Sequence, residues 1–104
     1  MDEKILEALT NVEKKYANHE KFDEYLKDDI EPLKVEINFY YLKRIGYHLV
    51  EIFKDEELSR KIFEFAVETA SEEEDLIDVI SDITFLDEEW AKELQETYEV
   101  NINS

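Results

Sequence analysis

The chain has 104 residues, of which 43% are hydrophobic, and a formal net charge of −17 at pH 7. This length is typical of a single domain, here spanning residues 1–104, that buries roughly two thirds of its unfolded surface. Six Phe, six Tyr and one Trp argue against a disordered acidic chain. The absence of cysteine excludes disulfides and thiolate metal sites. The first residues lack the regions of a signal peptide, and no apolar stretch could span a bilayer, so we expect a cytoplasmic protein.

Helices are expected throughout. The chain has one Gly and one Pro, too few for the tight turns that β-hairpins need, and its apolar residues recur at helical spacing. The stripe of Ile5, Leu9 and Val12 predicts a first helix, and a short second helix is predicted around Leu26. The fold class is therefore all-α, with about six helices, and the N-terminal ones occupy residues 1–31.

A long third helix is predicted to begin at Pro32, because the missing N–H of proline costs nothing in the first turn of a helix. Its apolar stripe runs to a predicted end near Phe53. Asp55 then stands where it can cap a fourth helix. We therefore expect a first helical hairpin over residues 32–70.

A second hairpin is predicted over residues 71–100. Ser71 and Glu74 have the spacing of a capping box, which would open a fifth helix. Asp87 stands where it can cap a sixth helix. The tail from Val100 to Ser104 is expected to fray.

The two hairpins share an internal repeat. Residues 53–62, FKDEELSRKI, align with residues 85–94, FLDEEWAKEL, at a spacing of 32. The segment 87–94 resembles a repeat motif of bacterial HEAT-like and tetratricopeptide-like helical proteins, and the resemblance extends over residues 42–98. It implies two stacked helical hairpins, with Trp90 buried between them. Chance similarity between two amphipathic hairpins is the alternative.

The negative charge is concentrated in the last third of the chain. Residues 68–99 contain thirteen acidic residues and a single base, Lys92. Such a field attracts basic surfaces and repels nucleic acid and anionic membranes. We therefore expect a basic protein partner, no direct nucleic-acid binding and no membrane binding. Basic neighbours elsewhere, such as Lys43 and Arg44, lie among acids and are expected to form intramolecular pairs.

The acidic residues of the last two predicted helices fall in rows. Three of them recur at i, i+3 and i+7 on the fifth helix, opposite its apolar residues, and three more recur at i, i+4 and i+7 on the sixth, so two parallel rows of carboxylates are predicted. Like charges at these spacings destabilise a helix by roughly 0.2 to 0.5 kcal/mol per pair. This cost favours the hypothesis that the acidic face has a function. A surface kept only for solubility is the alternative. The candidate partner-binding residues of this region are Glu72, Glu73, Glu74, Asp75, Asp78, Asp82, Glu89, Glu93 and Glu96.

Three tyrosines of the long third helix are further candidates for partner binding. Tyr40, Tyr41 and Tyr47 surround its apolar stripe, and aromatic residues beside an acidic rim often anchor protein interfaces. Completion of the core is the alternative role for these side chains.

Catalysis and metal binding are not indicated. The two histidines, His19 and His48, have no nucleophile suggested by a known motif, and His48 is expected to be a partly buried helix residue. Almost every carboxylate falls on a polar helix face, so paired catalytic carboxylates are not expected either. No metal-binding spacing is present. We expect a protein that is not an enzyme and has no cofactor.

Small acidic all-α proteins of this kind resemble, as a class, the immunity proteins that bacteria pair with nuclease toxins. The resemblance lies in size and charge and implies an inhibitor that covers the nucleic-acid-binding surface of a basic nuclease toxin. A mimic of DNA aimed at a defence enzyme is a close variant. The alternative is a helical-repeat adaptor that grips a protein without inhibiting it.

Overall fold

Six α-helices and one π-helical turn make up residues 2–102, the part of the chain that the computed structural model describes. The all-α prediction is confirmed. In chain order the elements are α1 (Glu3–Tyr16), η1 (Asp23–Lys27), α2 (Asp28–Leu33), α3 (Phe39–Glu51), α4 (Glu56–Thr69), α5 (Glu73–Ile83) and α6 (Glu88–Tyr98).

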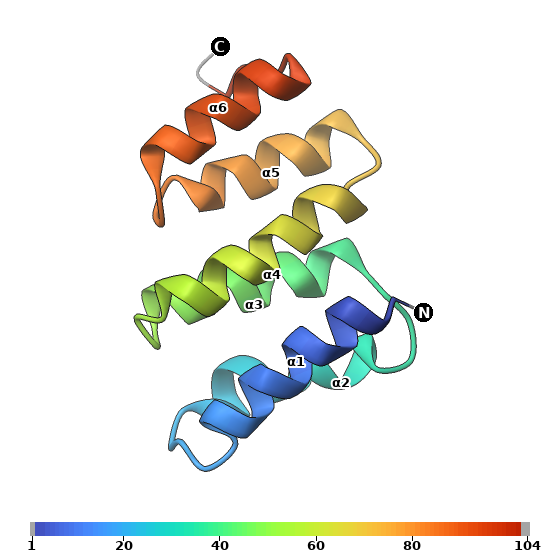
Figure 1. Ribbon diagram of the computed structural model, residues 1–104, viewed down its shortest axis with the longest axis vertical. Coiled ribbons are helices and arrows are strands. Elements are labelled where there is room, and N and C mark those ends of the chain that lie inside the picture. The colour runs from blue at the N-terminus through green and yellow to red at the C-terminus, as the bar shows by residue number, and fades with distance from the viewer. Residues whose placement is uncertain (1, 103–104) are drawn as a thin grey trace.

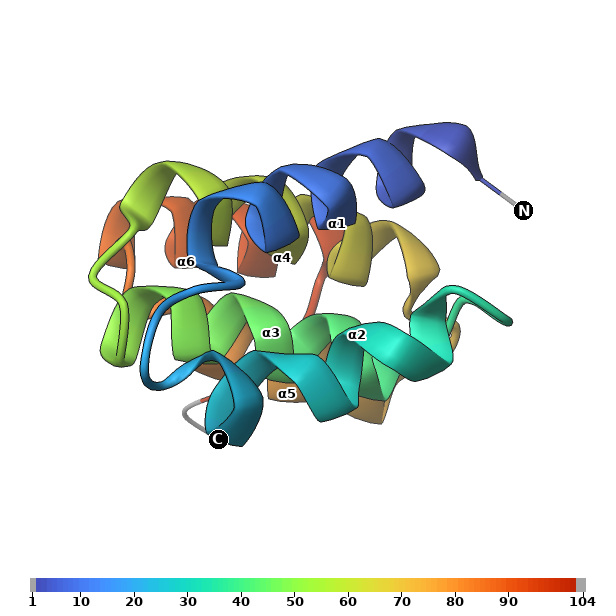
Figure 2. The same ribbon diagram turned by 90° about the horizontal axis from the view of Figure 1, so that it is seen from below.

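The helices follow one another along the long axis of the molecule (Figure 1) and lie in two layers that face each other across that axis. Seen from below, α1, α4 and α6 form the upper layer, and α2, α3 and α5 form the lower layer (Figure 2). Contacts run within the layers, as between α1 and α4 or α3 and α5, and across them, as between α3 and α4. The pairs α3–α4 and α5–α6 are thus two helical hairpins that lie side by side.

The contact between α3 and α4 is the most extensive among the described helices. Gly46 faces the ring of Phe63, which is fully buried. The hydroxyl of Ser59, also fully buried, donates to the carbonyl oxygen of Gly46 at 2.6 Å. Because a side chain at position 46 would hold the helices apart, the single glycine of the chain is explained by this close approach.

Both predicted aspartate caps are confirmed, and they occupy equivalent places in the two hairpins. Asp55 accepts from the backbone N–H of Leu58, and Asp87 accepts from that of Trp90, each at 3.1 Å. At the spacing of 32, the end of α3 and the start of α4 coincide with the end of α5 and the start of α6. These matching boundaries agree with a repeat, while membership of a HEAT-like class stays a prediction.

Each cap is also held by a basic residue of the preceding helix in the upper layer. Lys15 Nζ lies 2.7 Å from Asp55, and the hydroxyl of Tyr16 donates to the same carboxylate oxygen at 2.6 Å. Arg60 of α4 lies 3.2 Å from Asp87, and its guanidinium carbon stands 4.2 Å from the ring centroid of Trp90. Trp90 is only 9% exposed, as predicted. These contacts fix α1 on α4 and α4 on α6.

The predicted start of the long helix at Pro32 is wrong. Pro32 lies inside α2, and the long helix α3 begins only at Phe39, after Asn38 caps it by accepting from the N–H of Tyr40. The buried stripe of Leu26 and Leu33 carries the second helical segment past residue 31. Proline beyond the first turn removes a helix hydrogen bond, but the buried Leu33 keeps this turn within α2, and Asn38 supplies the cap that starts α3. The first hairpin is therefore residues 39–69 rather than 32–70.

Two further local predictions also differ from the structure. Ser71 does not cap α5, because the N-cap is Glu72 and its side chain makes no capping bond. The tail is not frayed at Val100, which is 8% exposed and donates its N–H to the carbonyl of Gln95. Glu99, with φ 56°, forms the left-handed residue of a Schellman motif there. Residues 103–104 lie outside the described part of the chain.

Candidate functional site

The predicted carboxylate row of α5 is divided between two environments. Asp78 is exposed and Asp75 is half-buried. Asp82 turns toward α3, where Lys43 Nζ lies 3.4 Å from its carboxylate. One of the three acids is therefore committed to an internal ion pair, and the row borders the lower-layer surface of α3.

The predicted row of α6 is exposed along its whole length. Glu89, Glu93 and Glu96 all face solvent, and Lys92 lies 3.8 Å from Glu89. Because α6 is in the upper layer and α5 in the lower (Figure 2), the two rows are carried by different layers of the fold. Whether they act as one face stays a prediction.

Acidic residues gather near three helix ends. The C-terminal ends of α4 and α6 and the N-terminal end of α5 lie on the same side of the stack, at the right of Figure 1. No basic residue occupies the last turn of α4 or α6. Glutamates in these last turns lie at the negative end of the helix dipole, which is unfavourable. We name this region the acidic end, and its exposed residues are Glu68, Glu72, Glu73, Glu74, Glu96 and Glu99.

Most acids of residues 68–99 have no ion-pair partner among residues 2–102. Asp82 pairs with Lys43, Asp87 with Arg60 and Glu89 with Lys92. Lys43, Arg44, Lys15 and Arg60 form the internal pairs that the sequence predicts for them. The acidic end and Glu93 of the α6 row are therefore left as an uncompensated negative field.

The three candidate tyrosines differ in exposure. Tyr40 is 53% exposed, whereas Tyr41 and Tyr47 are half-buried against the core. Tyr40 packs its ring edge-on against Tyr41, with centroids 5.6 Å apart, and lies beside the guanidinium of Arg44. Tyr47 faces the ring of Phe85, which sequence reasoning missed. The signal for Phe85 was its place in the repeat, which does not reveal whether another helix covers it.

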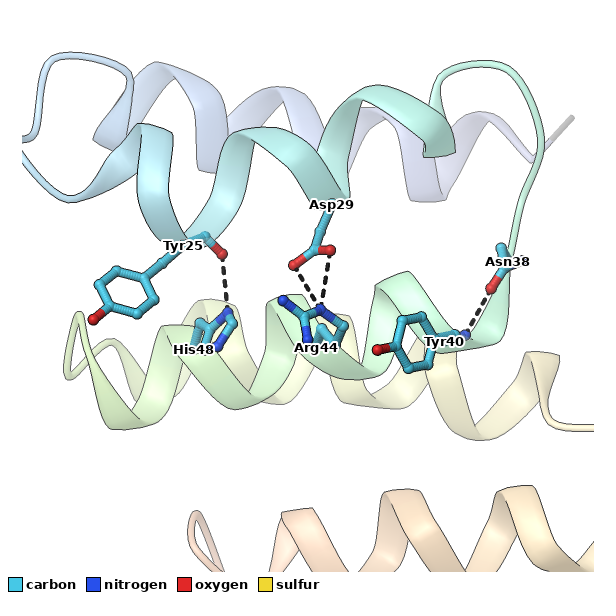
Figure 3. A network of polar contacts seen from close by, with 6 residues as sticks. All are labelled: Tyr25, Asp29, Asn38, Tyr40, Arg44 and His48. Atoms are coloured by element: carbon cyan, nitrogen blue, oxygen red, sulfur yellow. Dashed lines mark hydrogen bonds and ion pairs between the residues drawn. The ribbon is translucent and has the colours of Figure 1, made fainter.

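A polar network joins η1 and α2 to α3 (Figure 3). Arg44 Nε donates to both carboxylate oxygens of Asp29 at 3.1 Å, and Asp29 is 6% exposed. His48 Nδ1 lies 2.9 Å from the carbonyl oxygen of Tyr25. Because a carbonyl oxygen only accepts, this nitrogen carries the proton and donates. His48 is half-buried as predicted, and here it acts as a structural clamp.

The described residues form neither a metal-binding cluster nor a helix that could span a membrane. No cluster of three or more His, Asp or Glu residues among residues 2–102 could hold a metal ion. None of the helices in this range is long and apolar enough to cross a bilayer.

The pKa values of three carboxylates predict how stability depends on pH. Burial raises the pKa of Asp82, which Lys43 opposes and the charge of Asp78 reinforces. For Asp55, burial is outweighed by hydrogen bonds from Lys15, Tyr16 and the backbone, so its pKa is lowered. The backbone N–H of Trp90 lowers the pKa of Asp87, which burial opposes and Arg60 reinforces.

We therefore expect the melting temperature to rise as the pH falls from 7 toward about 4, and to fall below that pH. A raised folded-state pKa means that the folded protein takes up a proton more readily, so Asp82 favours the fold on mild acidification. The stabilisation by Asp55 is lost only as the pH drops below the unfolded value of about 3.9 and through its lower folded pKa. Calorimetry from pH 7 to 3 measures this curve. Asp82→Asn should reduce the initial rise, and Asp23→Asn, at an exposed position, is the control.

A steady decrease in melting temperature from pH 7 to 5.5 would contradict this account, because it would mean that favourable ion pairs outweigh the burial of Asp82 and the repulsion among unpaired acids. Added salt at pH 7 should raise the melting temperature, since it screens that repulsion.

No protein-family model matches the sequence, and comparisons with curated proteins and with solved structures found no significant match. The function is therefore inferred from the surface itself.

Proposed function

We propose that this chain is a protein-binding inhibitor of a basic enzyme that acts on nucleic acid, as an immunity or antitoxin-like protein against a nuclease toxin would be. The unpaired acids of residues 68–99 carry the proposal, because they leave an excess of negative charge on a folded body. A surface that binds nucleic acid is basic, so such a field is complementary to it.

The position of the acids supports a use for them beyond solubility. Glu68 and Glu96 lie near the C-terminal ends of α4 and α6, where a negative charge opposes the helix dipole. Solubility would be served equally well by acids placed elsewhere on the surface. A binding role explains why Glu68 and Glu96 occupy helix ends where a negative charge disfavours the fold.

This chain would inhibit the enzyme by occupying its substrate-binding surface, without taking part in any chemical reaction. Carboxylates that take the places of phosphates cover the enzyme surface that would hold its substrate. The opposite fields of the two proteins also accelerate their encounter. An inhibitor of this kind works where cellular nucleic acid is exposed to the toxin, which places it in the cytoplasm. A mimic of DNA directed at a defence enzyme would use the same surface.

Affinity capture at low salt from lysate of the source cells tests the proposal. The immobilised chain should retain a basic nucleic-acid-acting protein that elutes with rising salt, because charge pairs weaken as ionic strength increases. The purified partner should then lose its catalytic activity at a near-stoichiometric ratio of this chain.

A retained partner whose activity is unaffected would contradict inhibition and favour the adaptor function, for which the two adjacent hairpins offer an extended surface. Retention of neutral or acidic proteins alone would contradict the proposal that the partner is basic.

A further inference from the structure

Helix α3 carries a different charge from its two neighbours in the lower layer, α2 and α5. It contains Lys43, Arg44 and a single acid, Glu51. The flanking helices α2 and α5 contain several acids and no basic residue. The surface of the lower layer therefore has a central stripe without excess negative charge, bordered on both sides by acidic helices.

The two cations of this stripe are neutralised by the flanking helices. Arg44 pairs with Asp29 of α2, and Lys43 pairs with Asp82 of α5. Both contacts tie α3 to its neighbours and leave no net charge between the four groups. The centre of the surface is thus defined by its aromatic residues rather than by charge.

Aromatic residues are exposed along this stripe. Tyr40 is 53% and Phe85 58% exposed, and they are two of the four large hydrophobic residues exposed within residues 2–102. Tyr40, Arg44 and Tyr47 follow one another at i, i+4 and i+7, so they share one side of α3. The rings of Tyr47 and Phe85 meet edge to face with centroids 5.7 Å apart. Between α3 and α5 the surface forms a shallow hollow of about 240 Å³, lined by Lys43, Arg44, Tyr47, His48, Asp82 and Phe85.

We propose that this surface, the α3 face of Tyr40, Arg44, Tyr47 and Phe85, is the centre of the contact with a basic protein partner. The hollow receives one side chain of that partner, and the exposed acids of α2 and α5 pair with basic residues around it. This inference rests on the proposed function for the sign of the partner's charge. Its physical basis is that interfaces have an aromatic, Arg-containing centre from which unpaired charge is excluded, with a polar rim.

The charge of the flanking helices decides between a foreign partner and a second copy of this chain. In a twofold dimer through the α3 face, residues of one surface meet the same surface of the other copy. The acids of α2 and α5 would then be brought close to those of the partner copy, which is unfavourable. A basic protein meets the same acids favourably.

Site-specific photo-crosslinking in lysate tests the location of the contact. The probe is the full chain with benzoylphenylalanine in place of Tyr40, Tyr47 or Phe85, one position at a time. The control probe carries it in place of Asn11 on α1, and a comparison probe carries it in place of Glu93 in the α6 row; both positions are exposed. We expect the three α3-face probes to form the same discrete adduct with a basic protein, the Asn11 probe to form little of it, and the Glu93 probe to form no more of it than the α3-face probes.

Each other outcome overturns a definite part of the inference. An adduct with a basic protein only at Glu93 would leave the proposed function in place and refute the α3 face. An adduct at the α3 face with a neutral or acidic protein would refute the basic partner, and an adduct of two copies of this chain would show a dimer interface. No adduct at any α3-face position would refute the contact.

Alanine variants then test whether the aromatic residues are anchors. Phe85→Ala and Tyr40→Ala change exposed side chains, so the fold should persist. Each should weaken binding of the crosslinked protein about tenfold or more, because central aromatic residues dominate interface energies. Tyr98→Ala, on α6 and 42% exposed, is the matched control and should change binding less than threefold. Equal losses in all three variants would contradict an interface centred on α3.

Discussion

Replacing Trp90 with alanine is expected to lower the free energy of unfolding by about 3 to 5 kcal/mol, as for other buried aromatic residues. Trp90 is 9% exposed, and Arg60 of α4 stacks over its ring. The substitution removes the large side chain that holds α6 against α4 and leaves a cavity between the two hairpins. No other aromatic residue of α6 is buried within the described residues.

Urea unfolding followed by circular dichroism measures this loss. Tyr98→Ala is the matched control, since Tyr98 lies on the same helix and is 42% exposed, and it should cost less than about 1 kcal/mol. In the unchanged protein, Trp90 fluorescence should be blue-shifted and shielded from quenchers. A red-shifted and freely quenched emission would contradict the packing of α6.

The Gly46→Val variant should be destabilised by about 3 kcal/mol, the upper part of the usual range for overpacking. A Cβ atom at this position would lie 2.7 to 3.0 Å from ring carbons of Phe63, and the ring is fully buried. Valine adds two methyl groups beyond that clash, so α3 and α4 must separate. The hydrogen bond from Ser59 to the carbonyl of Gly46 would be strained as well.

Gly46→Ala separates the two physical effects at this position. Alanine gains about 1 kcal/mol in helix propensity over glycine, which offsets part of the clash, so its net effect should be smaller than that of valine. Combining Gly46→Ala with Phe63→Leu should recover stability relative to the sum of the single changes. A valine variant as stable as the unchanged protein would contradict the close approach of α3 and α4.

Those parts of the fold that rest on local chemistry could be predicted from the sequence. Asp55 and Asp87 each precede an amphipathic segment, and a cap followed by such a segment defines a helix start almost by itself. At Pro32 and at Ser71, the sequence signal for a helix start competed with a neighbouring residue, Asn38 and Glu72 respectively, that occupies the N-cap in the structure. Proline is typical of the first turn of a helix, which suggested a start at Pro32, but the nearby Asn38 provides the cap that α3 uses. The packing of Leu33 in the core decides between them, and packing is not a local property.

For the candidate site, the sequence predicted which residues are acidic and exposed, but not which residues of different helices come into contact. The exposure of Glu89, Glu93 and Glu96 follows from helical periodicity alone. The pairing of Asp82 with Lys43 does not, because it depends on α3 and α5 lying side by side in one layer. The spacing of Tyr40 and Tyr47 was visible in the sequence, but whether another helix covers them is decided only by the order of helices in the stack.

The measurement that tests the central claim most directly is a titration of the captured nuclease's activity with charge variants of this chain. One variant carries Glu72→Gln, Glu73→Gln and Glu74→Gln at the acidic end. Its control carries Glu3→Gln, Glu7→Gln and Glu20→Gln, three exposed positions in the first part of the chain, so the change in net charge is the same.

If the acids of residues 68–99 bind the enzyme, the first variant should inhibit at least tenfold more weakly than the unchanged chain and associate more slowly. The control should inhibit nearly as well as the unchanged chain. Equal inhibition by both variants would show that only total charge matters, or that the acidic end makes no contact, and either result would contradict a binding surface built from these acids.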